Sequence, residues 1–163
     1  MKAAQTIPDT EKAEYPAIRA AERAILGQGE RGSTVSSEKK RLKICVFDSD
    51  RESLEDIKQL LSAMGHEVMT IGQAIGASNK IRRYSPDILV ADIIGPTISG
   101  LKFIEVLRNN LEDLPRMILF SRVSEDELSL LAKKAGAEDF VVKNGSYTEL
   151  VNRIKLHASR MRN

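Results

Sequence analysis

Five short apolar runs alternate with stretches of helical spacing from residue 42 to the end of the chain. The runs are LKICVF at 42–47, HEVMTI at 66–71, ILVA at 88–91, MILF at 117–120 and FVV at 140–142. A strand that is apolar at nearly every position must be covered on both faces, which a parallel sheet with helices on either side provides. We therefore predict an α/β fold built on a five-stranded, doubly wound parallel sheet.

The segments that follow the apolar runs predict five helices. They cover 53–65, a stretch that ends near Tyr84, 100 to about 108, 125–135, and a last helix that starts within SYTE at 146–149. In the last helix, Ser146 and Glu149 have the spacing of a capping box. With right-handed crossovers, five such strand–helix units favour a flavodoxin-like sheet with strand order 2-1-3-4-5.

The first 40 residues differ in composition from the rest of the chain. They are rich in Ala, Gln, Glu, Lys and Arg, and they end in GQGERGSTVSSEKK, whose Gly and Ser content is typical of a flexible linker. Residues 16–26 have the spacing of a short helix, and both a marginal or disordered segment and a docking helix stay open for them. We predict a flexible or partly helical N-terminal arm at 1–40 and one domain at 41–163.

Charge and composition argue against several classes of protein. The 25 basic and 23 acidic residues leave a net charge of only +2, without the concentrated basic surface that nucleic-acid backbones select. Cys45 is the only cysteine and lies inside an apolar run, so no disulfide framework is possible within the chain. No apolar stretch approaches the roughly 18 residues of a membrane span. We predict a cytoplasmic protein that binds neither nucleic acid nor membrane.

Polar side chains follow four of the five predicted strands. They are Asp48, Ser49 and Asp50 after the first strand, Asp92 after the third, Ser121 after the fourth and Lys143 after the fifth. In this fold ligands bind at the carboxyl ends of the strands, near the switch in strand order. The set offers a nucleophilic carboxylate, further acids for a divalent cation, and donors for phosphoryl oxygens. It therefore indicates phosphate chemistry on an aspartate with Mg²⁺.

Residues 42–160 resemble the receiver domain of two-component response regulators. The likeness runs through ICVFD, GHEV, PDILVADIIGPTISG, ILFS and GAEDFVVKN, of which the third is the most specific. In that segment a proline and a glycine stand four and eight residues after an aspartate, in the register of the family. The resemblance implies that Asp92 is the phosphorylated residue. It also implies that Mg²⁺ is held by Asp48, Asp92 and the backbone carbonyl of Ile94.

The resemblance implies roles for three further residues and for partner proteins. Lys143 would bind the phosphoryl group, the hydroxyl of Ser121 would follow it, and the Phe140 ring would change rotamer with it. The phosphoryl group would come from a histidine kinase, a phosphotransfer protein or a small phosphodonor. We expect a stand-alone receiver whose face around the last two helices and the last strand selects a downstream protein partner, and a homodimer is a further expectation.

Three positions depart from the family's usual pattern. The second of two adjacent acids is Ser49, a poorer ligand for a hard dication, so either water fills its place or Asp50 bends in. The proline that usually follows the lysine is Asn144, which predicts a trans peptide because the cis form without proline costs about 3 kcal/mol. Arg122 stands where a small residue is common, and it would screen the pocket or reach the phosphoryl group. A pseudo-receiver that binds partners without phosphorylation is therefore the alternative function.

Two further interpretations concern the polar residues: a phosphatase site at Asp48 and Asp50, and purely structural roles for Asp50 and the two histidines. Asp48 and Asp50 match the DxD pattern of haloacid-dehalogenase-type phosphatases, although that pattern expects Thr or Val next and leaves Asp92 without a role. Asp50 also stands where it could cap the first helix. His66 and His157 have no second ligand at metal-binding spacing, and we interpret both as structural.

Overall fold

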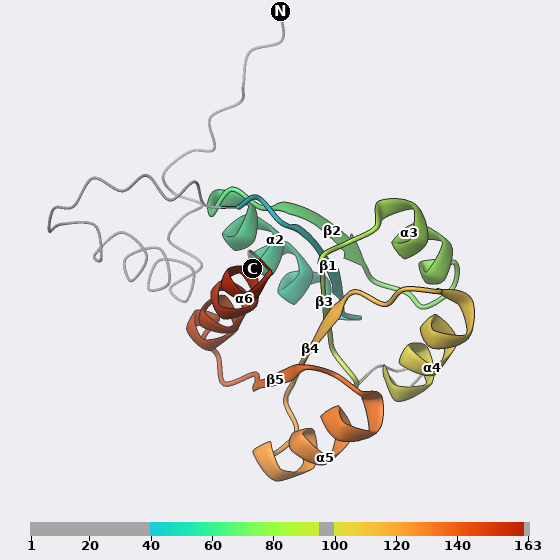
Figure 1. The fold of residues 1–163 in the computed structure, drawn as a ribbon. Helices are drawn as coiled ribbons and strands as arrows, with labels where there is room; N and C mark the ends of the chain where they lie inside the picture. Colours follow the sequence, from blue (N-terminus) through green and yellow to red (C-terminus); the bar gives the residue numbers. More distant parts are fainter. Residues whose placement is uncertain (1–39, 95–99, 162–163) are drawn as a thin grey trace, which may run out of the picture.

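A computed structural model of the chain describes residues 40–94 and 100–161 (Figure 1). The strands are β1 (Lys43–Phe47), β2 (Glu67–Ile71), β3 (Ile88–Ala91), β4 (Arg116–Ser121) and β5 (Asp139–Val142). The helices are α2 (Arg51–Ala63), α3 (Ala77–Tyr84), α4 (Gly100–Asn110), α5 (Glu125–Ala135) and α6 (Thr148–Arg160). All strand pairs are parallel and the order is β2-β1-β3-β4-β5. The predicted fold class, strand order and five helices are confirmed. The arm predicted at 1–40 lies outside the described residues, apart from residue 40.

The helices cover both faces of the sheet. In Figure 1, α2 and α6 lie on one face, while α3, α4 and α5 lie on the other. Alternate residues of β1 supply both layers: Ile44 and Val46 pack into the cluster beneath α2 and α6, whereas Cys45 and Phe47 pack into the cluster beneath α3 to α5. This two-sided burial explains why the strands read as continuous apolar runs. Within the described residues, every helix is too short or too polar to cross a bilayer.

The buried thiol of Cys45 gives a pH-dependent prediction. Burial raises the pKa of the Cys45 thiol from 9.0 to about 12. Above the lower value the unfolded thiol ionises while the folded thiol stays protonated, so unfolding releases a proton. We expect the contribution of this thiol to the free energy of unfolding to be fully present below about pH 9 and to fall by about 1.4 kcal/mol per pH unit above it. Urea unfolding across this range should show a steeper loss for the wild type than for Cys45→Val, and equal slopes would contradict the prediction.

The start of α6 differs from the prediction. The helix begins at Thr148 with Tyr147 as its N-cap, and no side chain caps it, so the capping box predicted from Ser146 and Glu149 is wrong. Both side chains have other partners. The Ser146 hydroxyl accepts the amide of Thr148, only two residues on, at 3.2 Å, and the Glu149 carboxylate accepts a hydrogen bond from Arg153 at 2.7 Å.

The two histidines both tie strands to neighbouring segments. His66 Nδ1 accepts the amide of Leu42 at 3.3 Å, where the chain enters β2. His157 is 1% exposed, and its Nε2 lies 3.2 Å from the carboxylate of Asp139, joining α6 to β5. These contacts support the structural interpretation of both residues.

Candidate functional site

The backbone of neighbouring strands fixes three residues at the carboxyl edge of the sheet. The amide of Asp48 donates to the last residue of β2 at 3.1 Å, that of Asp92 to the last residue of β1 at 2.8 Å, and that of Lys143 to the last residue of β4 at 2.7 Å. The sheet hydrogen bonding thus continues one residue past the strands. It places the starting points of all three side chains at the same edge of the sheet.

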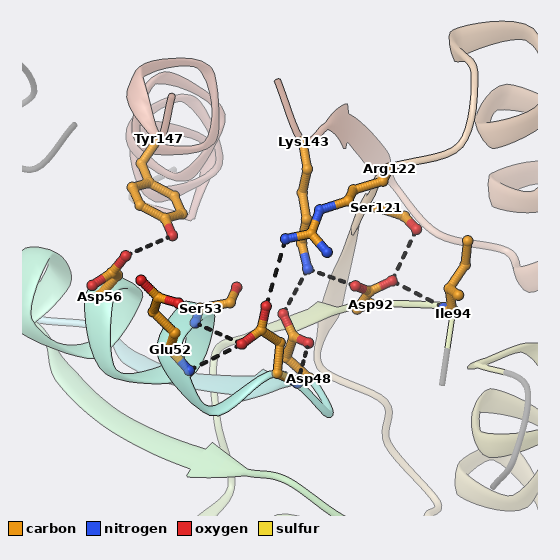
Figure 2. Close-up of polar contacts among 11 residues, drawn as sticks. Asp48, Glu52, Ser53, Asp56, Asp92, Ile94, Ser121, Arg122, Lys143 and Tyr147 are labelled. Carbon is orange, nitrogen blue, oxygen red and sulfur yellow. Dashed lines mark hydrogen bonds and ion pairs between the residues drawn. The ribbon is translucent and has the colours of Figure 1, made fainter. Parts of the chain in front are cut away.

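The ammonium of Lys143 joins two carboxylates that come from different strands (Figure 2). Its Nζ lies 2.6 Å from Asp48 Oδ2 and 2.5 Å from Asp92 Oδ2. The side chains are only 7%, 3% and 10% exposed for Lys143, Asp48 and Asp92 respectively. One buried cation therefore serves two buried anions, and the cluster carries a formal excess of one negative charge. Such an excess attracts a further cation to this edge.

The other carboxylate oxygens are also hydrogen-bonded. Asp92 Oδ1 accepts from the hydroxyl of Ser121 and from the amide of Ile94, both at 2.9 Å. Asp48 Oδ1 accepts from the amide of Asp50 at 2.9 Å. Figure 2 shows Ser121 and Ile94 on one side of Asp92 and Lys143 on the other. The Asp92 carboxylate is therefore held between a hydroxyl donor and an ammonium donor.

Asp50 serves as the N-cap of α2. Its Oδ1 accepts hydrogen bonds from the amides of Glu52 at 3.0 Å and Ser53 at 3.4 Å, so of the two roles left open for Asp50 the structure shows the helix cap. Its Oδ2 lies 3.5 Å from the guanidinium of Arg122. Ser49 is exposed. The carboxylates that contact the Lys143 ammonium are those of Asp48 and Asp92, and neither Ser49 nor Asp50 adds a further oxygen to this contact.

The remaining predicted residues are placed as follows. Phe140 is half-buried in β5 and packs against the cluster beneath α3 to α5. The side chain of Ile94 is 54% exposed, and its amide, rather than its carbonyl, makes the contact with Asp92. No described peptide bond is cis, so the trans peptide predicted before Asn144 is confirmed.

Asp48 and Asp92 present the features of a Mg²⁺ site with two carboxylates. Both side chains reach the same nitrogen atom, so their oxygens converge on one region at the sheet edge. Among the described residues no group of three or more His, Cys, Asp or Glu could hold a metal. Mg²⁺ needs only one or two carboxylates because it keeps several of its waters. The residues present therefore fit this ion.

A cavity of about 270 Å³ opens beside Lys143, between α2 and the loop before α6. Tyr147 closes one side by donating its hydroxyl to Asp56 Oδ2 at 3.1 Å. Burial raises the pKa of both groups, and the negative charge of Asp56 adds to the effect on Tyr147. The sequence carries no signal for this contact because the two residues are 91 positions apart and neither belongs to a motif.

Gly100 packs directly against the backbone that carries Asp92. Its amide donates to the carbonyl of Ile93 at 2.9 Å, and a Cβ at this position would lie 2.2 Å from Ile93 Cα and 2.9 Å from the Asp92 carbonyl. Neither backbone atom can move without shifting the site. We expect Gly100→Ala to lower the free energy of unfolding by about 1–3 kcal/mol, as overpacking does.

Urea unfolding of Gly100→Ala against Gly72→Ala measures this effect. A Cβ at position 72 would meet its nearest neighbour at 3.7 Å, an ordinary contact. Equal stability of the two variants would show that the close approach at Gly100 is relieved without cost.

The fold and the site together define a class of protein: a flavodoxin-like domain with acids, a hydroxyl and a lysine gathered at the switch in strand order. Comparison with known families then gives the family itself. Residues 44–155 match the response regulator receiver domain, and the chain belongs to this family. It is a family of two-component signalling domains rather than of enzymes, and its members typically bind Mg²⁺. The match excludes the phosphatase interpretation of Asp48 and Asp50.

Curated relatives include the response regulator MprA of Mycobacterium leprae (strain TN) and of Mycobacterium avium (strain 104). Each is 32% identical over 114 residues, which cover 70% of this chain and 50% of the relative. The chain thus spans about half the length of these relatives.

Solved structures with a similar fold include three response regulators. A two-component response regulator from Clostridium difficile has a TM-score of 0.68 at 22% identity, covers 76% of this chain and 100% of its own, and supports the fold alone. The BeF3-activated receiver domain of RstA from Klebsiella pneumoniae has a TM-score of 0.64 at 25% identity, with 71% and 97% covered. TrrA from Thermotoga maritima, in complex with Mg²⁺ and BeF, has a TM-score of 0.61 at 28% identity, with 71% and 98% covered.

Proposed function

We propose that this receiver domain accepts a phosphoryl group on Asp92 and signals through protein contacts. The donor would be a histidine kinase, a phosphotransfer protein or a small acyl phosphate. One observation carries the proposal: the Asp92 carboxylate is held between Lys143 Nζ at 2.5 Å and Ser121 Oγ at 2.9 Å. Two structural relatives are described with BeF3 or with Mg²⁺ and BeF, which supports the same chemistry here.

The proposed transfer is a displacement at phosphorus. A carboxylate oxygen of Asp92 attacks, and a P–O bond to Asp92 forms while the bond to the leaving group breaks. The electron pair goes to the imidazole nitrogen of a phosphohistidine, which then takes up a proton, or to the acetate oxygen when acetyl phosphate is the donor. Lys143 and Ser121 lie close enough to Asp92 to donate to two of the phosphoryl oxygens.

Mg²⁺ would be held by Asp48, Asp92 and the carbonyl of Ile94, and it would offset the negative charge of the phosphoryl oxygens. With Asp50 capping α2, we assign water rather than Asp50 to the place of the missing second acid at Ser49.

A pseudo-receiver is the second candidate, and one observation favours it. Asp50 turns its two oxygens to the helix amides and to Arg122, so it does not replace the acid that Ser49 lacks. Such a domain would bind its partner without taking up phosphate.

Incubation with labelled acetyl phosphate and Mg²⁺ separates the two candidates. We expect the wild type to take up acid-stable, base-labile label with a limit of one phosphoryl group per chain, and Asp92→Asn to take up none. Circular dichroism shows whether the variant is folded. Absence of label in the wild type, under conditions that modify an ordinary receiver, would favour the pseudo-receiver.

The cognate kinase or phosphotransfer protein, the downstream partner, the homodimer and the cytoplasmic location stay predictions. The stand-alone form is also a prediction. An immunoblot that compares the mass of the native protein in cell extract with that of the purified 163-residue chain tests it. A native protein of greater mass would contradict it.

A further inference from the structure

Arg122 lies beside the proposed phosphorylation site but is paired away from it. It directly follows Ser121, whose hydroxyl donates to Asp92 at 2.9 Å. Figure 2 shows the Arg122 side chain extending across the site toward α2. Its Nη2 lies 3.5 Å from Asp50 Oδ2. The pair thus bridges the end of β4 and the start of α2 above the buried cluster.

The pair between Arg122 and Asp50 is easily exchanged. It is a single long contact, and the two side chains are 71% and 39% exposed, so solvent screens it strongly. Asp50 caps α2 with its other oxygen, through the amides of Glu52 and Ser53. The helix cap therefore does not depend on the arginine, and the guanidinium can leave Asp50 without exposing an orphan amide.

A phosphoryl group on Asp92 would offer the guanidinium a stronger partner. It carries a charge of about −1.5 to −2 and three acceptor oxygens. In the proposed function, Lys143 and Ser121 donate hydrogen bonds to two of these oxygens. Arg122 lines the same 270 Å³ cavity as Lys143, and guanidinium groups bind phosphate through two parallel hydrogen bonds.

We propose that Arg122 exchanges Asp50 for the phosphoryl group on Asp92 and prolongs the lifetime of the phosphorylated state. This inference rests on the proposed function. In the hydrolysis that it slows, water attacks phosphorus and the P–O bond to Asp92 breaks. The electron pair returns to the carboxylate, and phosphate leaves with one proton of the water while the other proton goes to solvent. A guanidinium bound to the phosphoryl oxygens covers the side of the phosphoryl group that faces the cavity, and it hinders the approach of the attacking water.

The test measures the half-life of the phosphorylated full chain after the donor is removed. We expect Arg122→Ala to shorten it about fivefold to tenfold, since one charge-assisted interaction is lost, and Arg122→Lys to shorten it less. Asp50→Asn keeps a good N-cap but removes the competing charge, so it should lengthen the half-life. Arg41→Ala is the matched control because Arg41 is also 71% exposed in a weak pair, with Glu67 at 3.8 Å, and it should leave the half-life unchanged.

Each outcome decides the inference. Equal half-lives for the wild type and Arg122→Ala, with both chains labelled, would overturn it and leave the proposed function standing. Label in Arg122→Ala alone would also overturn it, because the guanidinium would then exclude the phosphoryl group. Absence of label in all chains would overturn the proposed function and this inference together. Thermal unfolding of each variant shows whether a shortened half-life comes from a damaged fold. A half-life of Arg122→Lys between those of Arg122→Ala and the wild type supports the charge of the side chain as the cause.

Discussion

Replacement of Lys143 by methionine is expected to lower the free energy of unfolding at neutral pH by about 3–5 kcal/mol and to abolish stable phosphorylation. The ammonium is the partner of both Asp48 and Asp92, at 2.6 and 2.5 Å, in a cluster that is nearly excluded from solvent. Without it, two buried carboxylates face each other with no cation between them. Methionine keeps an apolar side chain of similar length, so the loss is one of charge, including the contact of the ammonium with the Phe120 ring, whose centroid lies 5.2 Å from Nζ.

Urea unfolding in the presence of a chelator measures the effect, with Lys155→Met as the matched control. Lys155 is an exposed residue of α6, and its replacement should change stability by less than about 0.5 kcal/mol. The double variant Asp48→Asn with Lys143→Met should recover part of the loss because one of the two repelling charges is gone. Equal stability of Lys143→Met and Lys155→Met would show that the cluster is hydrated and that the lysine contributes little.

Two substitutions at the end of β1 are expected to shift the Mg²⁺ requirement in opposite directions. Asp48→Asn keeps an acceptor for the amide of Asp50 but removes a negative ligand, so the Mg²⁺ concentration for half-maximal phosphorylation should rise about tenfold to a hundredfold. Ser49→Asp adds the carboxylate that the usual pattern has, and this concentration should fall about tenfold.

Titration of acetyl phosphate labelling with Mg²⁺ measures both changes. Ser49 is exposed and Asp48 is buried, so thermal unfolding of each variant must accompany the titration. Unchanged midpoints in both variants would show that these side chains do not bind the ion. A lowered midpoint in Asp48→Asn would contradict the assignment of Asp48 as a ligand.

The sheet and its polar edge could be predicted because both follow from burial. Strands covered on two faces must be apolar throughout, so Asp48, Asp92 and Lys143 stand out as the first polar residues after each run. Their mutual distances could not be predicted. Nothing in the sequence indicates that one ammonium reaches two carboxylates 95 and 51 positions away.

Local side-chain competition explains the predictions that failed or stayed open. The capping box at Ser146 was wrong because the hydroxyl binds the amide two residues on and Glu149 binds Arg153 instead. Asp50 had two possible roles, since a carboxylate suits a helix N-cap as well as a metal. Only the orientation of its two oxygens, toward the amides of α2 and toward Arg122, identifies the cap.

Reduction of the phosphorylated chain with borohydride tests the central claim most directly. Hydride reduces an aspartyl phosphate to the alcohol, so the phosphorylated aspartate becomes homoserine and phosphate is released. Peptide mass analysis should find homoserine at Asp92 and at no other aspartate, and Asp92→Asn should yield none. Homoserine at Asp48, or an unmodified Asp92 in a chain that carries acid-stable label, would contradict the assignment of Asp92 as the phosphoryl acceptor.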